Sequence, residues 1–118
     1  MSPAELPLVS SIELLIFRDL DQDIFLNDPQ ILKGVPRKLL EGQLAQAVAD
    51  LFRQLPPGEP ARCHMPSFGL QFYSEDGNQQ ICSICWQCNN IYGDFQYNFD
   101  GSAPVSQKLL GLLDRLSW

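Results

Sequence analysis

Four cysteines and one histidine are the residues of this chain whose types and spacing could support chemistry. Cys63 and His64 are adjacent, and Cys82, Cys85 and Cys88 follow within 25 residues of them. Cys85 and Cys88 are separated by two residues, a spacing that occurs both in zinc sites and in redox-active pairs. These side chains can act together only if the fold of the rest of the chain brings them close to one another.

A hairpin is predicted around the Asp76-Gly77 dipeptide, between two stretches with strand character. A register that pairs Ser74 with Gln79 places Phe68 opposite Cys85 and Met65 opposite Cys88. A slip of one or two residues would bring Cys63 or His64 beside Cys88. We therefore expect four side chains at the open end of this hairpin: Cys63, His64, Cys85 and Cys88.

Zinc binding by Cys63, His64, Cys85 and Cys88 is one hypothesis, because three thiolates and an imidazole suit a tetrahedral Zn²⁺ ion. The local pattern argues against it. Residues 81–88 look like a strand in which Cys85 and Cys88 point to opposite faces, whereas a metal-binding C-x-x-C normally lies on a tight turn. A bend near Trp86 or Gln87 would be needed.

A redox-active Cys85–Cys88 pair is a second hypothesis, and it needs a thiolate stabilised by a helix N-terminus or a cation. Residues 63–107 contain four acids and no Lys or Arg, so only His64 and Arg62 could supply positive charge. A passive disulfide between Cys63 and Cys88 is geometrically easier. The remaining alternative is buried free thiols, which we favour for Cys82.

Other kinds of chemistry find little support in the composition. The 118 residues carry 8 Lys and Arg against 14 Asp and Glu, a net charge of −6 that disfavours nucleic acid as a partner. Eight of the twelve aromatic residues lie within residues 63–107, but without the basic groove that base stacking would require. No catalytic triad order or phosphate-binding loop is present, so we lean against an enzyme.

The hydrophobic pattern predicts strands and helices in the order β-α-β-β-β-α. The predicted elements are a buried strand at 11–17, a helical turn at 30–33, an amphipathic helix at 37–55, strands at 68–74, 80–88 and 95–99, and a final helix through Val105, Leu109, Leu112, Leu113 and Leu116, with Ser102 or Ser106 as its cap. The helix at 37–55 rests on Leu40, Leu44, Ala47, Val48, Leu51 and Leu55.

These elements predict one α+β domain spanning residues 1–118, a two-layer sandwich of an antiparallel sheet with two helices on one face. The segment 56–60, with three prolines, is an internal connector. Residues 1–7 show no export signal, and no apolar stretch approaches the roughly 20 residues that span a bilayer. We therefore expect a cytoplasmic protein without membrane contact.

The segments Cys63-His64-Met65-Pro66 and Ile84-Cys85-Trp86-Gln87-Cys88 resemble those of a set of small, uncharacterised bacterial proteins. Those proteins carry a Cys-(His or Phe)-x-Pro segment, a strand and an Ile-Cys-(Phe or Trp)-x-Cys segment before a leucine-rich helix. The resemblance covers roughly the C-terminal half, and it implies that Cys63, Cys85 and Cys88 belong together. It implies no activity.

Two functions are consistent with the sequence. The first is a small, non-catalytic, acidic bacterial protein-interaction domain that binds a basic protein partner, by analogy with other small acidic proteins. The second is a zinc-binding or thiol/disulfide module centred on Cys63, His64, Cys85 and Cys88.

Overall fold

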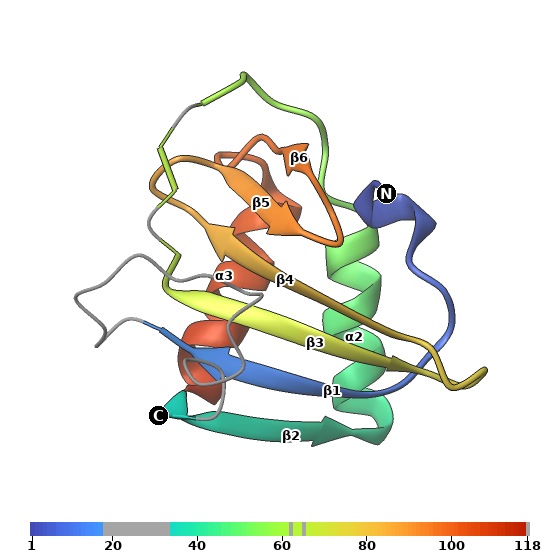
Figure 1. Ribbon diagram of the computed structural model, residues 1–118. Helices are drawn as coiled ribbons and strands as arrows, with labels where there is room; N and C mark the ends of the chain where they lie inside the picture. The colour runs from blue at the N-terminus through green and yellow to red at the C-terminus, as the bar shows by residue number, and fades with distance from the viewer. Residues whose placement is uncertain (18–33, 62, 65, 118) are drawn as a thin grey trace.

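The computed structural model describes residues 1–17, 34–61, 63–64 and 66–117. Within these residues the chain is an α+β protein in which two α-helices cover one face of a six-stranded antiparallel sheet (Figure 1). The elements are η1 (Pro3–Glu5), β1 (Val9–Ile16), β2 (Arg37–Glu41), α2 (Gly42–Arg53), β3 (Phe68–Ser74), β4 (Gln79–Cys85), β5 (Asn90–Gly93), β6 (Tyr97–Asn98) and α3 (Pro104–Leu116). The predicted helical turn at 30–33 lies outside the described residues.

The six strands lie in the order β2-β1-β3-β4-β5-β6, and every neighbouring pair is antiparallel. The predicted fold class is therefore confirmed, but β2 and β5 were not predicted. The structure has β5 where a turn was expected, and the strand expected at 95–99 is reduced to β6 and a single bridge between Pro57 and Phe99.

Residues 37–41 form strand β2 and not the first turn of the predicted helix. Gly42 ends the strand with φ of +62°, a left-handed conformation that glycine adopts at little cost. The helix begins at Gly42 and ends at Arg53. The hydrophobic pattern is misleading here. Leu40 is buried as a strand residue, but its spacing from Leu44 also fits a helix, so the apparent helical stripe begins before α2.

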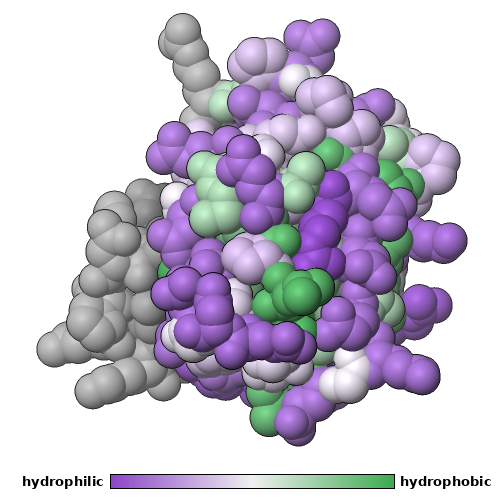
Figure 2. Space-filling view, turned by 90° about the vertical axis from the view of Figure 1, so that its right-hand side faces the viewer, coloured by the Kyte–Doolittle hydropathy of each residue, from purple (hydrophilic) through white to green (hydrophobic). Residues whose placement is uncertain are grey.

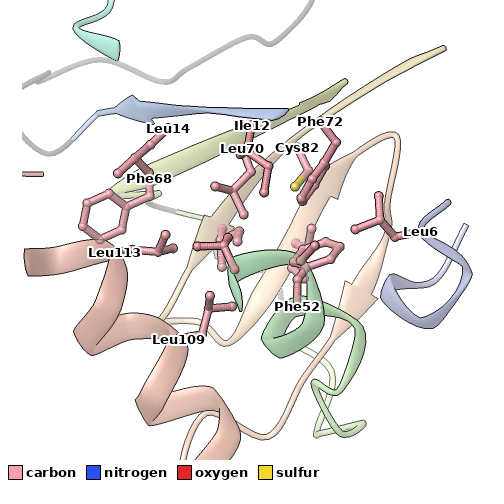
Figure 3. Packing of buried hydrophobic residues seen from close by; sticks show 14 of the residues in the cluster. Leu6, Ile12, Leu14, Phe52, Phe68, Leu70, Phe72, Cys82, Leu109 and Leu113 are labelled. Atoms are coloured by element: carbon pink, nitrogen blue, oxygen red, sulfur yellow. The ribbon is translucent and has the colours of Figure 1, made fainter. Parts of the chain in front are cut away.

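The main core lies between the sheet and the helices (Figure 3). Strand side chains including Ile12, Leu70 and Phe72 point towards Phe52 of α2 and Leu109 of α3. The residues of α2 that are buried are Ala45, Val48, Ala49 and Phe52, whereas Ala47 of the predicted stripe is exposed. The Phe52 ring contacts the rings of Phe72 and Phe95, with centroids 4.9 and 5.1 Å away.

A smaller cluster lies on the opposite face of the sheet, where Leu15, Phe17 and Val35 are buried and Ile81 packs against them. Gly69 of β3 makes room for this cluster. A Cβ atom at Gly69 would lie 2.7 Å from Cε2 of Phe17, so the ring rests directly on the backbone of the strand. The sheet therefore has hydrophobic contacts on both faces.

Helix α3 begins at Pro104 and buries Ser106, Leu109 and Leu113 against the core. The cap residue is Ala103 and not Ser102 or Ser106. The hydroxyl of Ser106 instead donates a hydrogen bond to the backbone oxygen of Asp100, 2.6 Å away, which fixes the preceding loop to the helix.

The described residues of segment 54–67, called the connector from here on, lie between α2 and β3 in the sequence and run past the β5–β6 end of the sheet (Figure 1). The amide of Gly58 donates to the backbone oxygen of Asn98 at 2.9 Å, and the amide of Asp100 donates to that of Pro56 at 2.9 Å. The Tyr97 hydroxyl also donates to the backbone oxygen of Leu55 at 3.0 Å. These bonds hold the first half of the connector beside β6.

The side of the molecule that bears the β3–β4 turn and the N-terminal segment is mostly hydrophilic, with hydrophobic atoms in separate patches (Figure 2). In the part of the chain that the structure describes, no helix has the length and apolar character needed to cross a membrane.

Candidate functional site

The Cys85-Trp86-Gln87-Cys88 segment forms a turn, which corrects the expectation of a continuous strand to Cys88. Strand β4 ends at Cys85, residues 86–89 are turn, and β5 begins at Asn90. Asn89 adopts φ of +55°, a left-handed conformation that reverses the chain and that Asn tolerates better than most residues. The amide of Cys88 donates to Sγ of Cys85 at 3.2 Å.

Cys63 of the connector and Cys88 of this turn form a disulfide, with their Cα atoms 5.8 Å apart and a separation of 25 positions in sequence. The two ends of the bond differ in exposure, since Cys63 is exposed and Cys88 is only 5% exposed. The disulfide therefore joins an exposed residue in the second half of the connector to a buried residue of the β4–β5 turn.

The hairpin register differs by one residue from the expected one, because Phe68 lies opposite Ile84 and not Cys85. Cys82 lies opposite Leu70 and belongs to the main core, where it is fully buried. Burial raises the pKa of the Cys82 thiol well above its usual range. The prediction that Cys82 acts as a small buried hydrophobic residue is confirmed.

His64 is held by two hydrogen bonds on the face of the sheet opposite to the helices. Its Nδ1 lies 2.7 Å from Oδ1 of Asn90, and its Nε2 lies 2.6 Å from Oγ of Ser83. The amide nitrogen of Asn90 donates to the backbone oxygen of Cys63, so Oδ1 faces the imidazole and accepts from Nδ1. Nε2 then carries no proton, and the Ser83 hydroxyl donates to it.

The imidazole of His64 also stacks on the ring of Tyr92, with centroids 4.1 Å apart and planes 18° apart. Its pKa is lowered because burial disfavours the charged form, an effect that the hydrogen bond to Asn90 partly offsets. His64 is therefore neutral near pH 7 and supplies no positive charge to the neighbouring disulfide.

The Ser83, His64 and Asn90 side chains form a chain of hydrogen bonds that resembles the polar part of a hydrolase triad. Ser83 is only 2% exposed and lies in the middle of β4, so its hydroxyl has no access to a substrate. The chain of bonds instead fixes the connector to β4 and β5.

The four residues expected to gather are thus only partly brought together. Cys63, Cys85 and Cys88 are close, while the ring nitrogens of His64 are directed to Ser83 and Asn90. Two of the four expected zinc ligands are joined in the disulfide, and neither is a thiolate in that state. Among the described residues, no group of three or more His, Cys, Asp or Glu side chains could hold a metal ion. The zinc set does not fit the disulfide-bonded structure.

A groove with a volume of about 530 Å³ lies next to this cluster and is lined by Ala61, Tyr92, Gln96, Tyr97 and Asn98. Tyr92, which stacks on His64, is 40% exposed and forms part of the wall.

Sequence reasoning missed Ser83, Asn90 and Tyr92. Their alternation along two adjacent strands was the available signal, but the unpredicted strand β5 concealed it.

Trp86 packs at the centre of the turn, with its ring 5.6 Å from that of Phe99 in an edge-to-face arrangement. Its Nε1 atom is buried and has no hydrogen-bond partner within the described residues. An unsatisfied buried donor costs free energy, so the turn is held by contacts that outweigh this loss.

Comparisons with protein-family models, curated proteins and solved structures gave no match to this chain.

Proposed function

We propose that this protein is a non-catalytic thiol/disulfide-responsive module. In this proposal, the Cys63–Cys88 bond controls how firmly the connector is held on the sheet. The observation that carries the proposal is the asymmetry of this bond, which joins an exposed residue, Cys63, to a buried one, Cys88. Exposed disulfides are the ones that exchange with thiols in solution.

Reduction would begin at Cys63, because this is the exposed residue of the pair. The thiolate of a small cellular thiol of the glutathione class attacks Sγ of Cys63, forming a new S–S bond while the Cys63–Cys88 bond breaks. The electron pair leaves on Sγ of Cys88, which takes a proton from water. A second small thiol then displaces Cys63 from the mixed disulfide, so two small thiols are oxidised and the protein disulfide is reduced.

The electrostatic setting argues against a fast oxidoreductase. A reactive thiolate normally needs nearby positive charge. His64 is neutral and residues 63–107 contain no Lys or Arg, so Arg62 is the one basic residue next to this segment in the sequence. We therefore propose a responsive tether and not an enzyme, and a cytoplasmic location in which the cellular thiol pool sets its state.

The tether governs the second half of the connector. The first half, up to Ala61, keeps its hydrogen bonds to β6 when the disulfide opens. The part around Cys63 and His64 then depends on the contacts of His64 and on the bond from Asn90 to the Cys63 backbone. Loss of the disulfide is expected to loosen this part, which covers Ser83 and the ring of Tyr92.

Differential alkylation with mass spectrometry tests the proposal on the whole protein in buffers of graded glutathione ratio. We expect Cys63 and Cys88 to change together between disulfide and thiol. Cys82 and Cys85, which are both buried, should label only after unfolding. Cys63→Ser should abolish the transition, whereas the matched control Cys82→Ala should retain it.

Backbone hydrogen exchange around residues 61–67 should rise on reduction, while exchange in β1 and β3 stays constant.

Two results would contradict the proposal. Four thiols that react in the native protein, before any reductant is added, would show that no disulfide exists. Stoichiometric zinc in elemental analysis of protein purified without chelator would favour the metal site at Cys63, His64, Cys85 and Cys88 instead.

A second proposal is the acidic interaction domain that binds a basic protein. It is supported by the absence of Lys and Arg from residues 63–107 and by the groove beside the exposed Tyr92 ring. Aromatic rings and carboxylates both attract cationic side chains. A basic partner should bind in a salt-sensitive complex that Tyr92→Ala weakens, and failure to recover any such partner would contradict this proposal.

A further inference from the structure

Strand β2 lies at one end of the sheet and has β1 as its only strand neighbour within the described residues (Figure 1). An edge strand presents a row of backbone N–H and C=O groups that can pair with another chain. Natural proteins usually protect such edges from pairing. The backbone groups and side chains of β2 that point away from β1 therefore indicate whether this strand can pair with another chain.

The hydrogen bonds on the inner side of β2 show which backbone groups face outwards. The amide of Ile16 donates to the oxygen of Pro36 at 2.9 Å, which makes this a hydrogen-bonded pair of the antiparallel ladder. Such pairs alternate with non-bonded pairs, so Lys38 and Leu40 also point their backbone groups towards β1. The backbone groups at the alternate positions therefore point away from β1, to the side where no described strand lies, and these positions are Arg37, Leu39 and Glu41.

The side chains of these same three residues share one face of the sheet, because successive residues of a strand alternate between faces. Leu39, in the middle, is 56% exposed and is among the most exposed large hydrophobic side chains of the described chain. Arg37 precedes it by two positions and Glu41 follows it by two, both exposed and opposite in charge. This pattern of charge, apolar residue and opposite charge is self-complementary.

We infer that two copies of this chain associate through antiparallel pairing of their β2 strands about a two-fold axis at Leu39. In this register Leu39 of one copy meets Leu39 of the other, and Arg37 meets Glu41 of the other copy. The two Leu39 residues exchange both backbone hydrogen bonds. The Glu41 amide donates to the Arg37 oxygen of the other copy, and the two sheets become one.

Three features favour a second copy over an unrelated chain. The residues with outward backbone groups are the same residues that the two-fold register places opposite each other. Each opposed pair is matched, with a hydrophobic pair at the centre and an Arg–Glu pair on either side. Glu13 of β1 lies 3.4 Å from Arg37 and keeps its guanidinium on this face.

Lys38, which in many edge strands opposes pairing, points to the other face of the sheet. Its Nζ donates to the backbone oxygen of Leu116 at the end of α3, 2.9 Å away. This charge is therefore directed away from the row formed by Arg37, Leu39 and Glu41, and does not oppose the two-fold contact.

Sedimentation velocity of the full chain over a wide concentration range tests the inference. The wild type should show a reversible monomer–dimer equilibrium, and Leu39→Lys should raise the dissociation constant by roughly tenfold or more, because two buried ammonium groups would meet at the axis. The matched control is Leu8→Lys, since Leu8 is 70% exposed and lies outside every strand. This variant should dimerise like the wild type.

Charge reversal separates the proposed register from other modes of association. Glu41→Arg alone should weaken the dimer, because the introduced guanidinium would lie opposite that of Arg37 in the other copy. The double variant R37E/E41R should recover part of the lost affinity, because it restores opposite charges across the axis but loses the ion pair between Arg37 and Glu13. Circular dichroism of each variant checks that it is folded. Monomers at every concentration, or a dimer that survives both Leu39→Lys and Glu41→Arg, would overturn the inference. The dimer should be unchanged by reduction of the disulfide, because two strands lie between β2 and β4 and three lie between β2 and β5.

Discussion

His64 and Tyr92 lie face to face, with ring centroids 4.1 Å apart, and so join the connector to β5 without a covalent bond. The same imidazole uses both nitrogens in hydrogen bonds to Ser83 and Asn90. One side chain of the connector thus contacts two neighbouring strands, and it comes from the residue that directly follows Cys63 in the sequence. His64 and the disulfide together hold the second half of the connector.

The contacts of His64 predict a pH dependence of stability. Its pKa in the folded protein is lower than in the unfolded chain, so the unfolded chain binds the proton more readily as the pH falls. The contribution of neutral His64 to stability is present above the unfolded pKa of 6.5 and is lost as the pH falls from there towards the lower folded pKa. The ring is contacted by the side chains of Asn90 and Ser83, which do not titrate, and by the face of the Tyr92 ring.

Thermal melts of the wild type and of His64→Phe between pH 7.5 and 5 check this prediction, and carboxylates that titrate in both proteins cancel in the difference. Phenylalanine can keep the stacking on Tyr92 but cannot be protonated. The gap in melting temperature should therefore narrow as the pH falls. A gap that is constant with pH would show that the protonation of His64 is not linked to folding.

The disulfide predicts a second effect on stability. A cross-link that closes a loop of this size restricts the unfolded chain and stabilises the fold by about 3 kcal/mol. Cys63→Ser should lose about this much in urea unfolding, and reduction of the wild type should produce a similar loss. Reductant should leave the stability of Cys63→Ser unchanged. If the reduced and oxidised wild type unfold at the same urea concentration, the Cys63–Cys88 bond does not constrain the chain.

The close approach of the connector to β6 predicts a third effect. A Cβ atom at Gly58 would lie within van der Waals overlap of the backbone oxygen of Phe99, a clash that neither segment can avoid without separating. Gly58→Ala should therefore destabilise the protein by at least about 1 kcal/mol, with faster hydrogen exchange at Asp100, whose amide bonds to Pro56.

Gly111→Ala is the matched control, because Gly111 lies within α3 and a Cβ there meets nothing within 4 Å. Alanine should stabilise the helix by up to about 1 kcal/mol. Equal effects of the two substitutions would mean that the connector is not packed against β6.

The fold class could be predicted from the sequence because the period of the hydrophobic pattern is clear in β1, β3, β4 and α3. Strand β2 could not be predicted, because Leu40 fits the hydrophobic stripe of the helix that follows. Only Gly42, in a left-handed conformation, separates the strand from α2. The closeness of Cys63 and Cys88 followed from the hairpin register. The side chains that contact His64 could not be predicted from this register. They lie on β4 and on β5, and the two Asn residues at 89–90 made β5 look like a turn.

The turn between β4 and β5 predicts a final pair of variants. Asn89 holds φ of +55°, and the energetic cost of this conformation is higher for residues with an ordinary Cβ than for glycine. Asn89→Ala should therefore be less stable than Asn89→Gly by about 1 kcal/mol.

Because Cys88 precedes this residue, the backbone strain at position 89 should also favour the reduced state of the disulfide. The alanine variant should therefore release its disulfide at a lower ratio of reduced to oxidised glutathione than the glycine variant. Quantitative alkylation of both variants in the same glutathione series measures the difference, and identical transitions would show that the turn conformation and the disulfide are independent.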